Sequence, residues 1–212
     1  MNSNLPIAVI GGTGKSGKYL VSKLIRQQIS IRLLLRNPGN FYIKSPLVST
    51  VLGDVRNYAS VHAFTQGCKA VISTLGQPKN ESTIFSQATK NIIKAMDEHH
   101  CKRYIVTTGL SVDTPFDKKN QQTQFATDWM KNNYPETTFD KQVEYTALTE
   151  SNIDWTLVRL PLIDLTDVTG KINLSTENCP GDKIGAANLA QFLIDQLTDD
   201  TYLMKAPFIA NE

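Results

Sequence analysis

The sequence is poor in cysteine and has no long apolar run, and both absences narrow the class of protein. Its three cysteines, Cys68, Cys101 and Cys179, are odd in number and far apart, which argues against a disulfide framework or a CxxC metal site. No apolar run reaches the roughly 18 residues that span a bilayer, and residues 1–6 carry no signal-peptide pattern. We therefore expect a cytoplasmic protein with reduced thiols, no membrane segment and no metal.

The chain also lacks an excess of charge of either sign. Lysine and arginine number 22 against 20 aspartates and glutamates, so the net charge of +2 gives no electrostatic reason to expect a nucleic-acid partner. Its 212 residues, 41% of them hydrophobic, can bury a core without staples. A single domain over residues 1–212 is predicted, and the sequence leaves the oligomeric state open.

Apolar strands and amphipathic helices alternate along the chain. Strands separated by helices pair in parallel through right-handed crossovers. The prediction is an α/β fold: a single Rossmann-type, doubly wound parallel sheet with helices on both faces. Strands are expected at 5–10, 29–35, 48–52, 70–75, 104–107 and 153–158, and helices near Asn57 and at 15–28, 79–100, 137–151 and 184–197, the last with Asp182 as N-cap.

Two irregular stretches, residues 109–120 and 160–182, follow the carboxyl ends of predicted strands. Ligands of open α/β sheets bind at that edge. We therefore expect these two loops to form the substrate region.

Glycines cluster between the first predicted strand and the first helix, where residues 11–17 read GGTGKSG. This segment satisfies both GxGxxG and GxxGxxG in the strand–turn–helix context that the motif requires. Glycines permit the tight turn and the close approach of a pyrophosphate, and the helix amino terminus offers N–H donors and partial positive charge. The candidate phosphate-binding residues are Gly11, Thr13, Gly14, Lys15, Ser16 and Gly17.

A Walker A loop is the rival interpretation, because Gly14, Lys15 and Ser16 resemble its end. That loop requires a glycine five positions before Gly14, where this sequence has Val9. The segment is therefore too short to wrap a triphosphate, and dinucleotide binding is favoured over nucleotide hydrolysis.

The end of the second strand indicates which dinucleotide is bound. An acidic residue there would accept a hydrogen bond from the ribose 2′-OH of NAD, but this chain has Arg36, whose guanidinium suits the 2′-phosphate of NADP. Lys15 can reach the same phosphate, and a solvated Arg36 remains the alternative. Asp54, followed by Val55, can either accept from the adenine amino group or cap the next helix.

These segments, in this order, resemble the atypical short-chain dehydrogenase/reductases, in particular the NAD(P)-binding NmrA-like group that includes biliverdin/flavin reductase B-type proteins. Further segments that carry the resemblance are STLG at 73–76, VTTG at 106–109 and DWTLVRLP at 154–161. The resemblance implies cofactor contacts from the loop after the fourth strand, from the fifth strand, and from the loop after the sixth strand, which covers the nicotinamide. The residues implied are Thr74, Leu75, Gly76, Thr107, Pro161, Leu162 and Ile163.

Standard members of the family use a serine, a tyrosine and a lysine in a Tyr-x-x-x-Lys spacing. The resemblance implies that Lys141 is that lysine, a cofactor-binding and catalytic residue that holds the nicotinamide ribose, with a surface lysine as the alternative. The tyrosine position holds Thr137, whose hydroxyl is far too weak an acid to replace a phenol. Tyr134 or Tyr145 can replace it only if the fold brings one of them to the site.

Two other residues of the implied catalytic site are Thr108 and Ser111, either of which can take the serine role or simply support the cofactor. Glu144 is expected to be a helix-face charge or a buried tie rather than a base.

The missing tyrosine bears on the chemistry. Reduction of a simple ketone needs a proton donor, whereas a reduced flavin, quinone or similar conjugated acceptor is a delocalised anion that water can protonate. An NADPH-dependent oxidoreductase with a conjugated small-molecule acceptor is therefore expected. The alternative is a non-catalytic NADP(H)-binding sensor that acts through a protein partner, and an epimerase, dehydratase or isomerase is less favoured.

Arg36→Asp tests the cofactor assignment. The substitution replaces a phosphate partner with a carboxylate that repels the 2′-phosphate, so the ratio of NADP to NAD affinity should fall by at least about tenfold, measured by calorimetric titration. An unaltered ratio would show that Arg36 does not select the cofactor.

Overall fold

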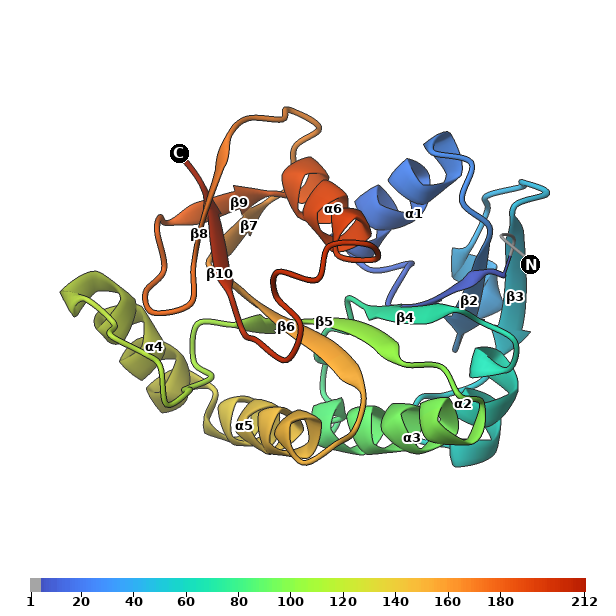
Figure 1. Cartoon of the computed structure of the whole chain (residues 1–212), viewed down its shortest axis with the longest axis horizontal. Coiled ribbons are helices and arrows are strands. Elements are labelled where there is room, and N and C mark those ends of the chain that lie inside the picture. The colour runs from blue at the N-terminus through green and yellow to red at the C-terminus, as the bar shows by residue number, and fades with distance from the viewer. Residues whose placement is uncertain (1–4) are drawn as a thin grey trace.

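A computed structural model describes residues 5–212, apart from the side chain of Asn40, so residues 1–4 of the predicted domain lie outside the described residues. The chain forms an eight-stranded sheet in the order β3-β2-β1-β4-β5-β6-β10-β8 (Figure 1). Every pairing in it is parallel except that of β10 with β8. The strands are β1 (Ile7–Ile10), β2 (Ile31–Leu35), β3 (Val48–Leu52), β4 (Ala70–Ser73), β5 (Arg103–Gly109), β6 (Asp154–Leu160), β8 (Ile172–Ser175) and β10 (Phe208–Asn211).

Helices cover both faces of the sheet, which confirms the doubly wound α/β prediction (Figure 1). On one face lie α1 (Gly17–Arg26) and α6 (Ala186–Asp195), and on the other lie α2 (Tyr58–Thr65), α3 (Phe85–Glu98) and α5 (Pro135–Thr149). Each face has its own apolar core, and β1 contributes alternate residues to both, Val9 to the first and Ala8 to the second. The apolar strands of the sequence follow from this burial on two sides.

Two of the predicted element boundaries are wrong for physical reasons. The helix expected over 79–100 begins only at Phe85, where Asp140 of α5 accepts hydrogen bonds from the backbone N–H groups of Phe85 (2.8 Å) and Ser86 (3.4 Å). A cap supplied from another helix leaves no local sequence signal. Asp182 is not the N-cap of the last helix, because Gly185 holds that position.

The two irregular stretches and their surroundings contain elements that the sequence did not predict. β7 (Leu162–Asp164) and β9 (Lys183–Gly185) pair in parallel as a separate small sheet, which places Asp182 just before a strand. α4 (Gln121–Asn133) follows the first loop and extends away from the sheet (Figure 1). Among the helices of residues 5–212, none has the length and apolarity needed to cross a bilayer.

The strand order reverses between β1 and β4, and the glycine loop lies at this switch point. Gly11 has a φ of +75°, and a Cβ built on it would lie 2.5 Å from the carbonyl oxygen of Thr74 after β4. A Cβ built on Gly17 would lie 2.0 Å from the carbonyl oxygen of Gly11. The close approach of β1, α1 and β4 therefore depends on two residues without side chains.

Gly17→Ala should lower the free energy of unfolding by about 2–3 kcal/mol, because the added methyl group forces α1 away from the turn. Urea denaturation measures the loss. Gly39→Ala is the matched control, since a Cβ there has no neighbour within 4 Å, and it should leave stability nearly unchanged. Equal stability of the two variants would contradict the close packing.

Candidate functional site

A cleft of about 340 Å³ opens at the carboxyl ends of β1, β2, β3 and β4. This is the edge at which open α/β sheets bind ligands. The loops that follow these four strands form its walls, so residues far apart in the sequence meet here. The lining residues are Ile10, Gly11, Thr13, Gly14, Leu34, Arg36, Gly53, Asp54, Val55, Arg56, Thr74, Leu75, Gly76, Gln77, Pro78 and Ile84.

The amino terminus of α1 meets this cleft through the glycine loop. Ser16 is the N-cap residue, yet its side chain makes no capping hydrogen bond, and the first turn of α1 contains no acidic residue. The first N–H groups of a helix have no partner within the helix, so they and the helix dipole favour an anion at this point. The loop is held in shape by the hydrogen bond from Gly14 N to Gly11 O (2.9 Å). Lys15 beside it is exposed.

At the other end of the cleft, four charged side chains form an ion-pair cluster. Arg36 donates from Nη1 to both carboxylate oxygens of Glu81 (2.8 and 3.0 Å). Arg56 donates to Asp54 (3.0 and 3.1 Å) and from Nη2 to Glu81 (2.6 Å). Hydrogen bonds from Arg56 lower the pKa values of both carboxyls, with Arg36 adding to the effect. Asn57 caps α2, so the alternative that Asp54 is that cap is wrong.

Two members of this cluster, Arg56 and Glu81, were missed by reasoning from the sequence. A signal for Arg56 was present, because it follows Asp54 by two residues at the end of the third strand, the same edge as Arg36. Glu81 carried no such signal, since residues 79–84 were assigned to a helix and are a loop.

The loop after β4 forms the middle of the cleft. Thr74 is tied to β1 through its backbone N–H and its hydroxyl, which both donate to Ile10 O (3.0 and 3.2 Å). Leu75 and Gly76 continue the wall, and Val55 lies opposite them within the same lining. The predicted residues of three different loops therefore share one cleft with the glycine turn.

Lys141 is buried on α5, which excludes the alternative of a surface lysine. Its ammonium donates to the carbonyl oxygen of Thr107 on β5 (3.1 Å) and to Glu144 (2.8 Å), and lies 3.7 Å from the centre of the Phe85 ring. Glu144 in turn accepts from Thr89 of α3 (2.8 Å). Of the two roles expected for Glu144, a charge on the helix face or a buried link, the structure therefore shows the buried link. An ammonium has three N–H donors, and these two contacts account for two of them.

The hydroxyls predicted near Lys141 are buried at the end of β5 and just after it. Thr108 and Ser111 are 5% and 3% exposed. Thr108 Oγ1 has no hydrogen-bond partner within residues 5–212. Neither candidate tyrosine joins them: Tyr145 packs edge-on against Trp155, and Tyr134 is half exposed beside Trp129.

A second cavity of about 420 Å³ lies between α4 and the loops around 109–120 and 160–182. Pro161 and Leu162 line it, whereas Ile163 packs toward the α1/α6 core. Two large apolar side chains on its rim are unusually exposed, Phe125 of α4 by 72% and Leu162 of β7 by 67%. The two stretches expected to form a substrate region do enclose a cavity.

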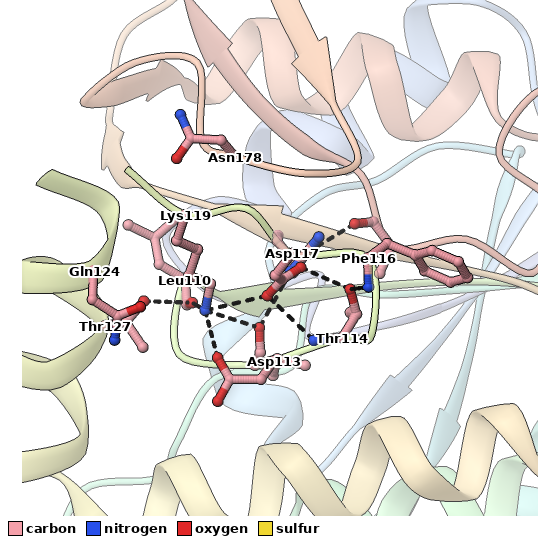
Figure 2. A network of polar contacts seen from close by, with 12 residues as sticks. Leu110, Asp113, Thr114, Phe116, Asp117, Lys119, Gln124, Thr127 and Asn178 are labelled. Carbon is pink, nitrogen blue, oxygen red and sulfur yellow. Dashed lines mark hydrogen bonds and ion pairs between the residues drawn. The ribbon is translucent and has the colours of Figure 1, made fainter. Parts of the chain in front are cut away.

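A polar network fixes the first of these loops (Figure 2). Lys119, whose side chain is 3% exposed, donates to Leu110 O (3.0 Å) and to Asp113 (2.6 Å). Asp117 pairs with the fully buried Arg159 of β6 at 2.6 Å. Arg159 also donates to Ala206 O (2.8 Å), just before β10.

Comparisons with known proteins agree with this geometry. A family described as NAD(P)H-binding matches residues 11–200. Among solved structures, a protein named ChuY, an anaerobilin reductase from Escherichia coli, has a TM-score of 0.81 at 17% identity, with 97% of each chain covered. A wide-type short-chain dehydrogenase/reductase from Veillonella parvula in complex with NADP has a TM-score of 0.79 at 16% identity, covering 97% of this chain and 94% of that one. A Burkholderia pseudomallei protein named as exported has a TM-score of 0.79 at 22% identity, covering 97% and 99%. At identities this low, the structural similarity shows a shared fold and no more.

Asp117→Asn should lower the free energy of unfolding by roughly 3 kcal/mol, because it leaves the buried guanidinium of Arg159 without its carboxylate. Lys118→Gln is the control: it breaks the exposed pair with Glu177 and should cost less than about 1 kcal/mol. Urea denaturation compares the two. Similar losses would mean that the buried pair does not hold the loop.

Proposed function

This chain belongs to the NAD(P)H-binding family, and from that premise we propose that it is an NADPH-dependent reductase that transfers hydride to a flat conjugated acceptor such as a flavin or a quinone. The observation that carries the proposal is the uncapped amino terminus of α1, which opens through the glycine turn onto the cleft at the switch point. The missing Cβ atoms of Gly11 and Gly17 create this approach. A dinucleotide diphosphate fits the donors and the space that they provide.

The remaining cofactor contacts are assigned by position along the cleft. The N–H groups at Thr13, Lys15 and Ser16 bind the diphosphate, and Gly14, whose own N–H closes the turn onto Gly11 O, allows its close approach. Arg36 and Arg56 lie at the adenosine end, where two guanidiniums favour a 2′-phosphate and hence NADP over NAD. Val55 and Asp54 border the adenine, and Thr74, Leu75 and Gly76 support the centre of the cofactor.

Lys141 holds the nicotinamide ribose with its remaining N–H donor in this proposal. Thr107 O and Glu144 fix the direction of the ammonium, so the lysine is pre-oriented before the cofactor arrives. NADPH, when bound, supplies the hydride. Pro161 and Leu162, which follow β6, shield the nicotinamide side from water, and Ile163 supports them from the α1/α6 core.

The acceptor is assigned to the side of Thr108, Ser111 and the cavity under α4. Thr108 has an unused buried hydroxyl that can donate to an acceptor oxygen. Thr137 holds the tyrosine position, Tyr134 and Tyr145 pack elsewhere, and the hydroxyl of the buried Tyr104 is already hydrogen-bonded to Thr89 (3.2 Å). A ketone would therefore lack the usual proton donor. An acceptor that delocalises the incoming charge takes its proton from water. The anaerobilin reductase and the NADP complex among the similar folds support a reductase of this kind.

A non-catalytic NADP(H) sensor is the second candidate, and the missing phenol is the observation that favours it. In that case the same cleft binds the cofactor and a protein partner reads its presence. For either function we place the chain in the cytoplasm, because its three buried cysteines are all free thiols.

The test is incubation with NADPH and a panel of flavins and quinones, followed by the loss of nicotinamide absorbance. The reductase predicts turnover, and Lys141→Ala should lower kcat/KM by about 100-fold, because the ribose loses its anchor. Lys102→Ala, on an exposed lysine away from the cleft, should leave turnover unchanged.

Loss of folding must be separated from loss of function. The double variant Lys141→Met with Glu144→Gln removes both buried charges together, so no unpaired carboxylate remains. It should fold and stay inactive. Wild-type binding of NADPH without turnover of any acceptor would favour the sensor, and no binding by the folded protein would refute both.

A further inference from the structure

Glu81 is the point at which both arginines of the cleft meet. Its carboxylate accepts from Arg36 through both oxygens and from Arg56 through Oε2. Both arginines line the cleft, and no other carboxylate within residues 5–212 contacts Arg36 by an ion pair. Glu81 thus already occupies Nη1 of Arg36 and Nη2 of Arg56, two of the donors assigned to a 2′-phosphate.

The charges at this end of the cleft cancel. Arg36 and Arg56 carry two positive charges at any working pH, and Asp54 and Glu81 carry two negative charges. The lowered pKa of Glu81, due first to the hydrogen bond from Arg56, keeps its carboxyl ionised near neutrality. A 2′-phosphate brings a further charge of about −1.5 to −2. Such a group gains little here unless one carboxylate leaves.

The two carboxylates are not held equally. Asp54 accepts from the backbone N–H of Arg56 (2.8 Å) as well as from its guanidinium, so Asp54 is fixed to the chain that bears it. Among residues 5–212, the side chain of Glu81 has only its arginine partners; it is one-third exposed and stands on a loop rather than on a helix or strand. Glu81 is therefore the carboxylate that can be displaced.

The backbone beside Glu81 stays in place when its side chain moves. Gln77 donates from Nε2 to the carbonyl oxygens of Pro78 (3.2 Å), Glu81 (2.9 Å) and Ser82 (3.3 Å), which closes the loop on itself. A change of side-chain rotamer is enough to release both guanidiniums from Glu81, while Arg56 stays paired with Asp54.

We propose that Glu81 is a specificity-determining residue: its carboxylate competes with the 2′-phosphate for Arg36 and Arg56 and thereby reduces the preference for NADP over NAD. The inference rests on the proposed function, because it concerns the same cleft. NAD has a hydroxyl in place of the phosphate, and it binds without displacing Glu81. The competition therefore weakens the binding of NADP and leaves the binding of NAD unchanged.

Glu81→Gln removes the charge and keeps the size of the side chain. The variant should bind NADP at least about tenfold more tightly than the wild type and NAD within about threefold of it, measured by calorimetric titration. Adenosine 2′,5′-bisphosphate and 5′-AMP should repeat this difference, since they probe the adenosine end alone. Glu98→Gln, an exposed glutamate at the end of α3 paired with His62, is the matched control and should change neither affinity.

A second variant shows whether the effect passes through the arginines. Adding Arg56→Gln to Glu81→Gln should abolish most of the gain for NADP, because one of the two released donors is gone. A gain that survives this addition would contradict the competition at Arg56.

The outcomes separate the two proposals. If both dinucleotides bind but Glu81→Gln leaves their ratio unchanged or lowers it, Glu81 is not a competitor, and the proposed function stands without it. If neither the wild type nor the variant binds any of the four ligands, the proposed function fails and this inference fails with it.

Discussion

The contact between Gly17 and the carbonyl group of Gly11 is the constraint from which the rest of the cleft follows. It brings the start of α1 against the end of β1, while Gly11 itself touches the backbone after β4. The start of α1, the end of β1 and the backbone after β4 thus meet where the strand order reverses, and the two glycines place no side chain between them. The Ser16 side chain does not cap the start of α1, which favours an anion at this point. The arginines and the β4 loop are placed relative to this point by the strands that precede them, and Lys141 is placed by α5.

Charged groups serve opposite purposes at the two ends of this strand edge. In the cleft at the ends of β2 and β3 they lie on loops, are partly exposed, and form pairs that a ligand can replace at small cost. Around the loop after β5 the charges are buried, and each has several partners, as in the pairing of Arg159 with Asp117 and the neighbouring carbonyl groups. Rearrangement there would leave a charge without solvent or partner. The ion pairs of the cleft can therefore rearrange, whereas those around the loop after β5 cannot.

The parts of this site that the sequence foretold are those encoded locally. The glycine loop carries its own geometry in its spacing, and Arg36 follows directly from the end of an apolar strand. The parts that escaped depend on contacts between distant segments. Asp140 of α5 decides where α3 begins, so the loop that bears Glu81 was taken for a helix. β8 pairs antiparallel with the last strand, and α4 buries only Thr123 and Thr127, so neither shows a clear apolar period.

Arg159 joins the loop after β5 to the approach to the last strand, with its guanidinium stacked 3.5 Å above the ring of Phe208. The loop beside the cavity under α4 is thus tied to the folding core, whereas two side chains on the rim of that cavity, Phe125 and Leu162, are mostly exposed. Substitutions of these rim side chains can therefore accumulate with little loss of stability, while substitutions in the buried Arg159 network cannot. Under the proposed function, homologues with this scaffold would differ in the acceptor they bind by exchanging rim residues, while the cofactor stays the same.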